Sequence, residues 1–303
     1  MRYFIYFQYD GANYHGWQRQ PNGISVQQVL EDAMSTLMRT PIALTGAGRT
    51  DAGVHARYMT AHFDTESTLD AEHLTKRLNV YLPADIAVFK IEAVENDLHA
   101  RFDALSRTYE YHVHTHKDAF INTQSLQVQP NIRFDLMNQA AATLFDYIDF
   151  TSFSKLHTDV KTNNCTITHA LWTQVSDNRW VFTITANRFL RNMVRAIVGT
   201  LLQVGTEKIS IDDFKRIIES KDRCQAGTSA PAHALFLVDV AYWCDLIGPW
   251  ACRRAVPDPF PERSRRVVEG HIQMLIFLQR LHLKHILRTF VPIICLFKTL
   301  NNL

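Results

Sequence analysis

A glycine-rich segment with one carboxylate at its centre is the part of the sequence best suited to chemistry. Residues 46–56 read Gly-Ala-Gly-Arg-Thr-Asp-Ala-Gly-Val-His-Ala, with Asp51 in the middle. Three glycines in eight residues indicate unusual backbone dihedral angles or the close approach of another group. A short carboxylate held by such a loop is ionised at neutral pH and can act as a nucleophile. It can equally serve only to bind the amides of a turn, as aspartates often do.

Two other uses of this segment fit less well. A glycine-rich loop can hold phosphate through its backbone amides, but this one lacks the Lys-Ser/Thr ending and the glycine spacing of such loops. A metal-dependent hydrolase would need His and Asp ligands at usable spacing, and the sequence offers no such cluster around Asp51. None of the five cysteines forms a C-x-x-C pair, so we expect neither a zinc site nor a disulfide framework.

The elements that must hold this segment follow the order β-α-β-β-α-β twice. The first set begins with an aromatic and β-branched strand, and Ser25 is placed to cap its first helix. The second set repeats the order between residues 107 and 242. The expected strands are 2–9, 42–45, 58–63, 86–94, 107–116, 166–175, 180–186 and 235–242, and the expected helices are 25–40, 70–79, 135–147, 189–204 and 212–220.

This order predicts an α+β fold of two tandem ferredoxin-like βαββαβ units. Their strands should form one joined, mostly antiparallel sheet, with the helices on one face and the active-site cleft on the other. We expect residues 1–104 to form an N-terminal catalytic unit that carries the glycine-rich loop. Residues 105–247 should form the C-terminal unit. Residues 248–303 are an atypical extension, basic and broken by prolines and then apolar.

Five other segments accompany the glycine-rich one along the chain. Together they resemble, in order, the motifs of the tRNA pseudouridine synthase A family, over about residues 3–242. One short motif alone would be weak evidence, whereas several in the same order are specific. The segments are Gly16-Trp17-Gln18-Arg19-Gln20, Leu98-His99-Ala100-Arg101-Phe102, Arg107-Thr108-Tyr109-Glu110-Tyr111, Asp149-Phe150-Thr151-Ser152-Phe153, and residues 189–199 with Arg191 and Arg195.

The resemblance implies an isomerase that works without a cofactor and without a metal. Such enzymes break the N-glycosidic bond of a uridine in tRNA, turn the base, and rejoin it to the sugar through carbon. By this similarity Asp51 is the attacking carboxylate, either at the ribose or at the pyrimidine ring. The implied substrate is the anticodon stem-loop of tRNA, at positions 38, 39 and 40.

Two further residues receive catalytic roles from the resemblance. Arg195 would pair with Asp51, because a guanidinium fixes the direction of a carboxylate. Arg191 lies four residues earlier and would share its helical face. Tyr109 would stack on the target uracil, although Tyr111 faces the same side of the strand. The alternatives are an RNA-facing helix surface for the arginines and a core position for Tyr109.

The remaining implied residues bind the substrate. A base inside a stem must be flipped out before it reaches a carboxylate, and Arg49 would fill the space that it leaves; a phosphate contact by Arg49 is nearly as good an interpretation. Other RNA contacts are expected from two segments, and basic residues near the motifs, Arg107 among them, would add electrostatic attraction. The segments are Leu98, His99, Ala100, Arg101 and Phe102, and Lys161, Thr162 and Asn163.

The partners and the location follow from the same resemblance. The resemblance implies a homodimer that binds tRNA. We expect it in the cytoplasm, because the N-terminus resembles a strand and not a secretory signal. No run approaches the ~20 apolar residues of a membrane span. Residues 1–247 hold 23 basic against 27 acidic side chains, so a surface for RNA there must be a local basic patch. The rival interpretation is a catalytically inactive tRNA-binding protein, which would be expected to lack Asp51, Tyr109 or Arg195.

Overall fold

The computed structural model describes residues 1–155 and 162–242 of the 303-residue chain. Lys161 and the extension at 248–303 lie outside these described residues. Nine strands within the described part form one sheet in the order β4-β1-β3-β9-β5-β8-β7, with β2 paired to β3 and β6 paired to β5. The strand pairs are antiparallel except for β3 with β9 and β5 with β6.

The N-terminal half contains the first β-α-β-β-α-β set. Ser25 caps α1 by accepting a hydrogen bond from the amide of Gln28, as the sequence predicts. The second strand, β2, is shorter than the expected 42–45, and β3 is longer than the expected 58–63. Between β2 and β3 the chain is a loop that bends at its glycines. The elements are β1 (Arg2–Tyr9), α1 (Val26–Met38), β2 (Thr45–Gly46), β3 (His55–Asp64), α2 (Ala71–Tyr81) and β4 (Ile86–Val94).

The C-terminal half repeats the set with an added helix. The helix expected over 189–204 begins only at Met193, because Asn192 adopts a left-handed backbone (φ 66°) that a helix cannot continue through. Arg191 is therefore in a loop and does not share a helical face with Arg195. The elements are β5 (Ser106–His114), β6 (Leu126–Gln127), α3 (Phe134–Thr143), β7 (Ile167–Ser176), β8 (Arg179–Ala186), α4 (Met193–Gly205), α5 (Ile211–Ser220) and β9 (Leu235–Ala241).

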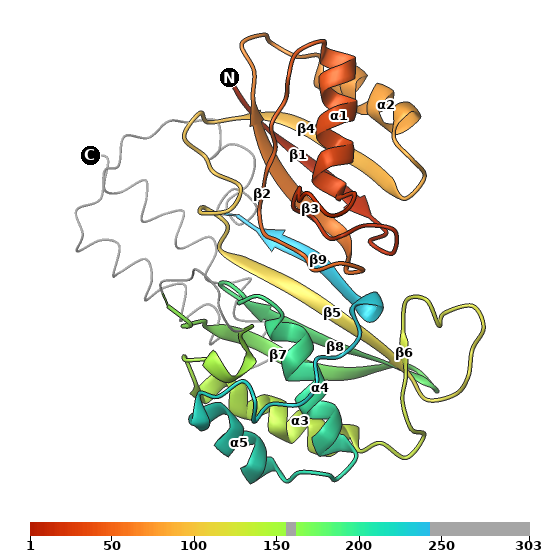
Figure 1. The fold of residues 1–303 in the computed structure, drawn as a ribbon, viewed down its shortest axis with the longest axis vertical. Coiled ribbons are helices and arrows are strands. Elements are labelled where there is room, and N and C mark those ends of the chain that lie inside the picture. The colour runs from red at the N-terminus through yellow and green to blue at the C-terminus, as the bar shows by residue number, and fades with distance from the viewer. Residues whose placement is uncertain (156–161, 243–303) are drawn as a thin grey trace, which may run out of the picture. The chain divides into compact units, whose positions relative to one another are not determined.

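The two halves have the same strand order and join in the middle of the sheet. In each half the fourth strand pairs with the first, the first with the third and the third with the second, which gives β4-β1-β3-β2 and β9-β5-β8-β7. The halves join where β3 pairs with β9 in parallel, at His55 with Phe236 and Ala56 with Leu237 (Figure 1). This confirms the predicted fold class of two ferredoxin-like units with a joined sheet.

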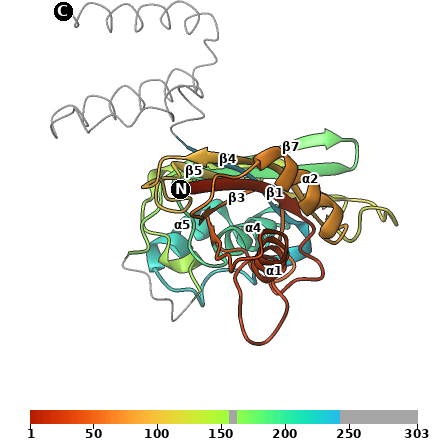
Figure 2. The ribbon, with the colours of Figure 1, turned by 90° about the horizontal axis from the view of Figure 1, so that it is seen from above.

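The helices form a layer against one face of the sheet. Figure 2 shows α1, α4 and α5 on one side of the strands. Strand residues that point to this layer, such as Phe7 and Trp172, are almost completely buried. The alternate residues of β7 point the other way, and Leu171 and Val175 are exposed there. The division of the chain at residues 105 and 248 stays a prediction.

Candidate active site

An ion pair between the two halves of the molecule is the centre of the site. Asp51 lies in the loop between β2 and β3, and Arg195 lies in the first turn of α4. Nη1 of Arg195 donates to Oδ2 of Asp51 at 3.1 Å, and both side chains are about one quarter exposed. Residues 144 positions apart are thus brought together by the fold, and the carboxylate still reaches solvent.

The backbone beside Asp51 is held by the Gly16-Trp17 segment. Gly16 has a left-handed backbone (φ 83°), and a Cβ there would clash with the carbonyl oxygen of Thr50. The amide of Trp17 donates to the Thr50 hydroxyl oxygen at 3.1 Å, and the hydroxyls of Thr50 and Tyr9 bond at 2.8 Å. The 16–20 motif therefore supports the backbone of the glycine-rich loop, a role that the sequence did not indicate.

His55 fixes the end of the same loop. Its Nε2 lies 2.9 Å from the carbonyl oxygen of His233, and its Nδ1 lies 3.1 Å from the amide nitrogen of Gly11 and 2.9 Å from a carboxylate oxygen of Asp10. The buried imidazole also stacks on Phe236 with ring centroids 4.6 Å apart. These contacts make His55 a residue that packs the loop.

The guanidinium of Arg195 is fixed by a second contact. Its Nε donates to the carbonyl oxygen of Ala230 at 2.7 Å, while the amide of Ala230 donates to the carbonyl oxygen of Arg195 at 2.9 Å. This exchange ties the segment before β9 to the start of α4. The direction in which the guanidinium presents its Nη1 to Asp51 is consequently set by backbone atoms.

Tyr109 on β5 interacts electrostatically with Asp51. Burial raises the pKa of Tyr109 to about 12, the positive charge of Arg107 opposes this rise, and the negative charge of Asp51 adds to it. Its ring packs edge-on against Phe189 at 5.2 Å, and its hydroxyl makes no hydrogen bond with the described residues. The phenol therefore stays protonated at neutral pH and cannot serve as a base there.

Tyr111 shares the side of Tyr109 but has another use. Its hydroxyl donates to the carbonyl oxygen of Pro231 at 3.0 Å, and the residue is fully buried. The alternation of the strand puts both rings on one side, and the packing separates their roles. Tyr111 belongs to the core, while Tyr109 keeps an unused hydroxyl.

Arg195 belongs to α4, and α4 packs on the side of the sheet that carries the helices (Figure 2). The position of the active-site cleft, expected on the face opposite the helices, stays a prediction.

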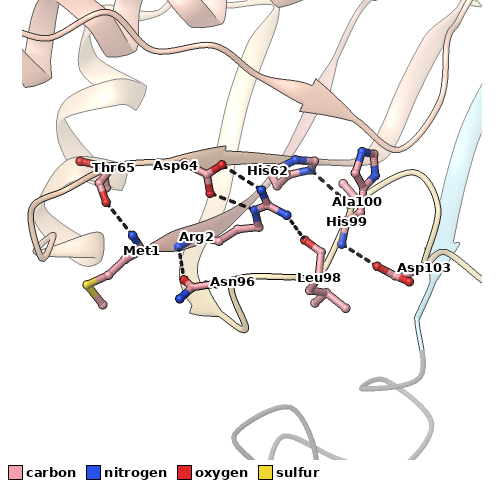
Figure 3. A network of polar contacts seen from close by, with 10 residues as sticks. All are labelled: Met1, Arg2, His62, Asp64, Thr65, Asn96, Leu98, His99, Ala100 and Asp103. Atoms are coloured by element: carbon pink, nitrogen blue, oxygen red, sulfur yellow. Dashed lines mark hydrogen bonds and ion pairs between the residues drawn. The ribbon is translucent and has the colours of Figure 1, made fainter. Parts of the chain in front are cut away.

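The segment Leu98–Phe102 is held by a network of polar contacts (Figure 3). The guanidinium of Arg2 donates to the carbonyl oxygen of Leu98 at 3.1 Å and forms a two-bond ion pair with Asp64. The amide of Ala100 donates to Nδ1 of His62 at 3.1 Å. Burial, with the nearby charges of Arg2 and His99, lowers the pKa of His62 to about 4, so its Nδ1 is free to accept at neutral pH.

The side chains at the end of this segment are presented to solvent. Phe102 is 75% exposed, and the ring of His99 packs against it with centroids 4.3 Å apart. The guanidinium of Arg101 lies 5.7 Å from the centre of the Phe102 ring. The segment therefore presents an aromatic ring and a cation together, a combination that can bind unpaired bases and phosphates.

The other expected RNA contacts are placed less clearly. Arg49 is exposed and forms no hydrogen bond or ion pair with the described residues. Thr162 uses its hydroxyl to accept from the amide of Asn164, and the side-chain amide of Asn163 donates to Thr151 at 2.9 Å. No hydrogen bond or ion pair joins Thr162 or Asn163 to Asp51, Arg195 or Tyr109 within the described part.

Residues 1–155 and 162–242 contain no group of three or more His, Cys, Asp and Glu side chains placed to hold a metal ion. The same residues form no helix long and apolar enough to cross a membrane.

Comparisons with known proteins agree with the motifs. A family model described as tRNA pseudouridine synthase matches residues 5–103 and 140–243. The tRNA pseudouridine synthase A of Parabacteroides distasonis is 62% identical over 242 residues, which cover 80% of this chain and 96% of the relative. The enzyme of Bacteroides thetaiotaomicron is 56% identical over 263 residues, which cover 86% of this chain and 98% of the relative. The enzyme of Limosilactobacillus reuteri is 40% identical over 249 residues, which cover 80% of this chain and 96% of the relative.

Proposed function

The chain belongs to the tRNA pseudouridine synthase family, and from this premise we propose that it modifies the anticodon stem-loop. It is an isomerase that converts uridine in tRNA to pseudouridine. The proposed targets are positions 38, 39 and 40, and the proposed nucleophile is Asp51. The cytoplasm is the expected location of this activity.

The observation that carries the assignment is the contact between Asp51 and Arg195. A guanidinium 3.1 Å from one carboxylate oxygen attracts its negative charge and fixes its direction. The other oxygen, Oδ1, receives no hydrogen bond from the described residues and is the proposed attacking atom. A carboxylate that is oriented on one side and free on the other suits covalent catalysis.

The reaction balances without any added reagent. The bond between N1 of the base and C1′ of the ribose breaks, and a bond between C5 of the base and C1′ forms. C5 loses its hydrogen as a proton, and N1 gains a proton. Asp51 can assist through a covalent adduct, either at the ribose or at the ring, and leaves when the product forms. Release of the hydrogen on C5 gives the reaction a direct assay.

Tyr109 and Arg49 are the proposed partners of the flipped uridine. The ring of Tyr109 would stack on the uracil, since its high pKa excludes it as a base at neutral pH. Arg49 is two residues from Asp51, exposed and without an intramolecular ion pair in the described part, so it is available to fill the space in the stem.

The residues proposed to bind the rest of the tRNA are those that the family motifs imply. Phosphate contacts by the cations would make tRNA binding weaken as salt increases. The residues are Leu98, His99, Ala100, Arg101, Phe102, Lys161, Thr162 and Asn163.

A homodimer is proposed as the working form. The face of β7 that points away from α3 exposes Leu171 and Val175, at 42% and 57%. Exposed apolar side chains on a sheet are a natural interface for a second copy of the chain. We propose that this face takes part in the dimer.

The proposed targets can be tested with tRNA transcripts that carry tritium at C5 of uridine. Transcripts with uridine at 38, 39 or 40 should release tritium to water, and a transcript with cytidine at all three should not. Equal release from the triple replacement would reject the anticodon stem-loop as the site. No release from any transcript would instead favour the rival, an inactive tRNA-binding protein.

A further inference from the structure

The guanidinium of Arg107, at the start of β5, is bonded to four carbonyl oxygens. Nη1 donates to Ala104 and Asn187, both at 2.9 Å. Nη2 donates to Ala47 at 2.9 Å and to Arg101 at 2.6 Å. The two terminal nitrogens carry four N–H groups, and these four bonds use all of them.

The carbonyls bonded by Arg107 belong to segments that the proposed function places around the substrate. Ala47 is in the glycine-rich loop, four residues before Asp51. Arg101 is in the Leu98–Phe102 segment. Asn187 begins the loop that leads into α4 and thus to Arg195. Within the described part of the chain, Arg107 is therefore the one side chain that donates hydrogen bonds to all three segments.

The chemistry of these bonds requires an arginine. No carboxylate pairs with Arg107 in the described residues, and burial lowers the pKa of its guanidinium. A charged group removed from water is costly unless hydrogen bonds replace its hydration. The planar fork of a guanidinium can meet four acceptors in fixed directions, whereas a lysine has three donors around one point.

We propose that Arg107 is a positioning residue, which holds the nucleophile loop and the RNA-contacting segment Leu98–Phe102 in one fixed relative geometry. It acts through the backbone at Ala47 and Arg101 and does not touch the substrate. This inference rests on the proposed function of Asp51. It also changes the role expected from the sequence, where Arg107 is counted among the cations that attract RNA.

The test compares Arg107→Lys and Arg107→Gln with the wild type and with Arg133→Lys. Arg133 is a matched control, because its exposed guanidinium also makes several hydrogen bonds but lies at the start of α3. We expect both Arg107 variants to fold and to lose about 10- to 100-fold in the single-turnover rate of pseudouridine formation, since small displacements of reacting groups are costly. The control should keep the wild-type rate.

The dependence of tRNA affinity on salt separates positioning from direct contact. Loss of a phosphate contact lowers the slope of log affinity against log salt by about one. Arg101→Ala should show that change, and Arg107→Lys and Arg107→Gln should keep the wild-type slope. A slope lowered by about one in Arg107→Gln would make Arg107 a phosphate contact and overturn the proposal.

The remaining outcomes are also decisive. Wild-type rates in both Arg107 variants, with Asp51→Asn inactive, would overturn the positioning role alone. A fully active Asp51→Asn protein would remove the proposed function instead, whatever the Arg107 variants show. Failure of both Arg107 variants to fold, seen by circular dichroism, would assign the residue to the stability of the fold and overturn the proposal.

Discussion

At the scale of single residues, the site depends on two opposite charges presented by different halves of the molecule. Asp51 comes from a loop of the N-terminal half and Arg195 from the first helical turn after the β8 strand of the C-terminal half. Neither half contains the pair alone. Asp51 is held through the hydroxyl of the neighbouring Thr50, which accepts from the amide of Trp17, and Arg195 is held through the carbonyl oxygen of Ala230.

Replacing Arg195 should affect the reaction more than the binding of tRNA. In Arg195→Ala the carboxylate loses the donor that orients it, so we expect a loss of about 100-fold in the single-turnover rate. The dissociation constant for tRNA should stay within a few-fold, because the guanidinium is engaged by Asp51 and Ala230. Both quantities can be measured on one preparation. A large loss of affinity at a normal rate would contradict this role.

The sequence motifs name candidate residues more readily than they indicate what those residues contact. Asp51 and Arg195, which were named from their motifs, form an ion pair in the structure. Arg107 was interpreted as a cation for RNA, because its four carbonyl partners are distant in sequence and carry no residue-type signal. The use of Thr50 and Tyr9 as supports was also missed, since a hydroxyl pair 41 positions apart leaves no local pattern.

At the scale of elements, the glycine-rich loop that carries Asp51 is positioned by a second loop, residues 16–20. Gly16 packs against the backbone of Thr50 in a left-handed conformation that other residues adopt only with strain. The motif at residues 16–20 is therefore a structural support of the glycine-rich loop. Trp17 completes that support by packing on Phe7 with ring centroids 5.3 Å apart.

A side chain at Gly16 should damage both stability and activity. Gly16→Ala combines an unfavourable φ with a clash against the Thr50 carbonyl, and strain of this kind costs about 1–3 kcal/mol of unfolding free energy. We expect a lower melting temperature and a lower single-turnover rate. Gly48→Ala is the control for stability, since a Cβ there meets nothing within 4 Å. Equal melting temperatures of Gly16→Ala and the wild type would contradict the prediction, because they would show that the loop rearranges without a cost in stability.

The network around Leu98–Phe102 predicts a dependence of stability on pH. The pKa of His62 is about 4 in the folded protein, below its ordinary value of 6.5, because of burial and the charges of Arg2 and His99, while Asp64 and Asp103 oppose the shift. The unfolded chain therefore binds a proton first, and stability falls as the pH drops from about 6.5 to about 4.

The variant His62→Asn isolates this effect. Asparagine can accept from the amide of Ala100 but does not titrate. When the pH is lowered from 7 to 5, the melting temperature of the wild type should fall more than that of His62→Asn. An equal fall in melting temperature in the two proteins would mean that the imidazole of His62 does not resist protonation.

The limits of the sequence are also visible in the elements. The periodic apolar pattern places α4 correctly, but it extends the helix to residue 189, because Phe189 and Leu190 are apolar too. The left-handed backbone of Asn192 makes the helix begin only at Met193 and leaves Phe189 outside it, where Phe189 packs on Tyr109. A backbone conformation of this kind is decided by tertiary contacts and not by composition.

At the scale of the whole molecule, the joined sheet explains why the site lies where it does. The parallel pairing of β3 with β9 brings the exit of the glycine-rich loop beside the segment that precedes β9 (Figure 1). Alternation along the strands predicts two faces of a sheet. It does not tell which face receives the charge from α4, because that depends on how the helix packs on the sheet.

The open face of β7 gives a prediction about assembly. Light scattering should give about twice the 34.9 kDa chain mass for the wild type. Leu171→Glu should give a single chain, because a charge on this face would oppose a second copy. Val80→Glu, on exposed α2, is the control and should stay dimeric. A monomeric wild type would reject the dimer, and a dimeric Leu171→Glu would place the interface elsewhere.

The central claim is that the carboxylate of Asp51 forms and breaks the bonds, and single-turnover formation of pseudouridine in Asp51→Asn tests it most directly. The amide keeps the shape of the side chain but is a far weaker nucleophile. We predict a folded protein that binds tRNA with nearly the wild-type affinity and forms no measurable pseudouridine, by tritium release or by mass spectrometry. Product formed at the wild-type rate by Asp51→Asn would contradict the account.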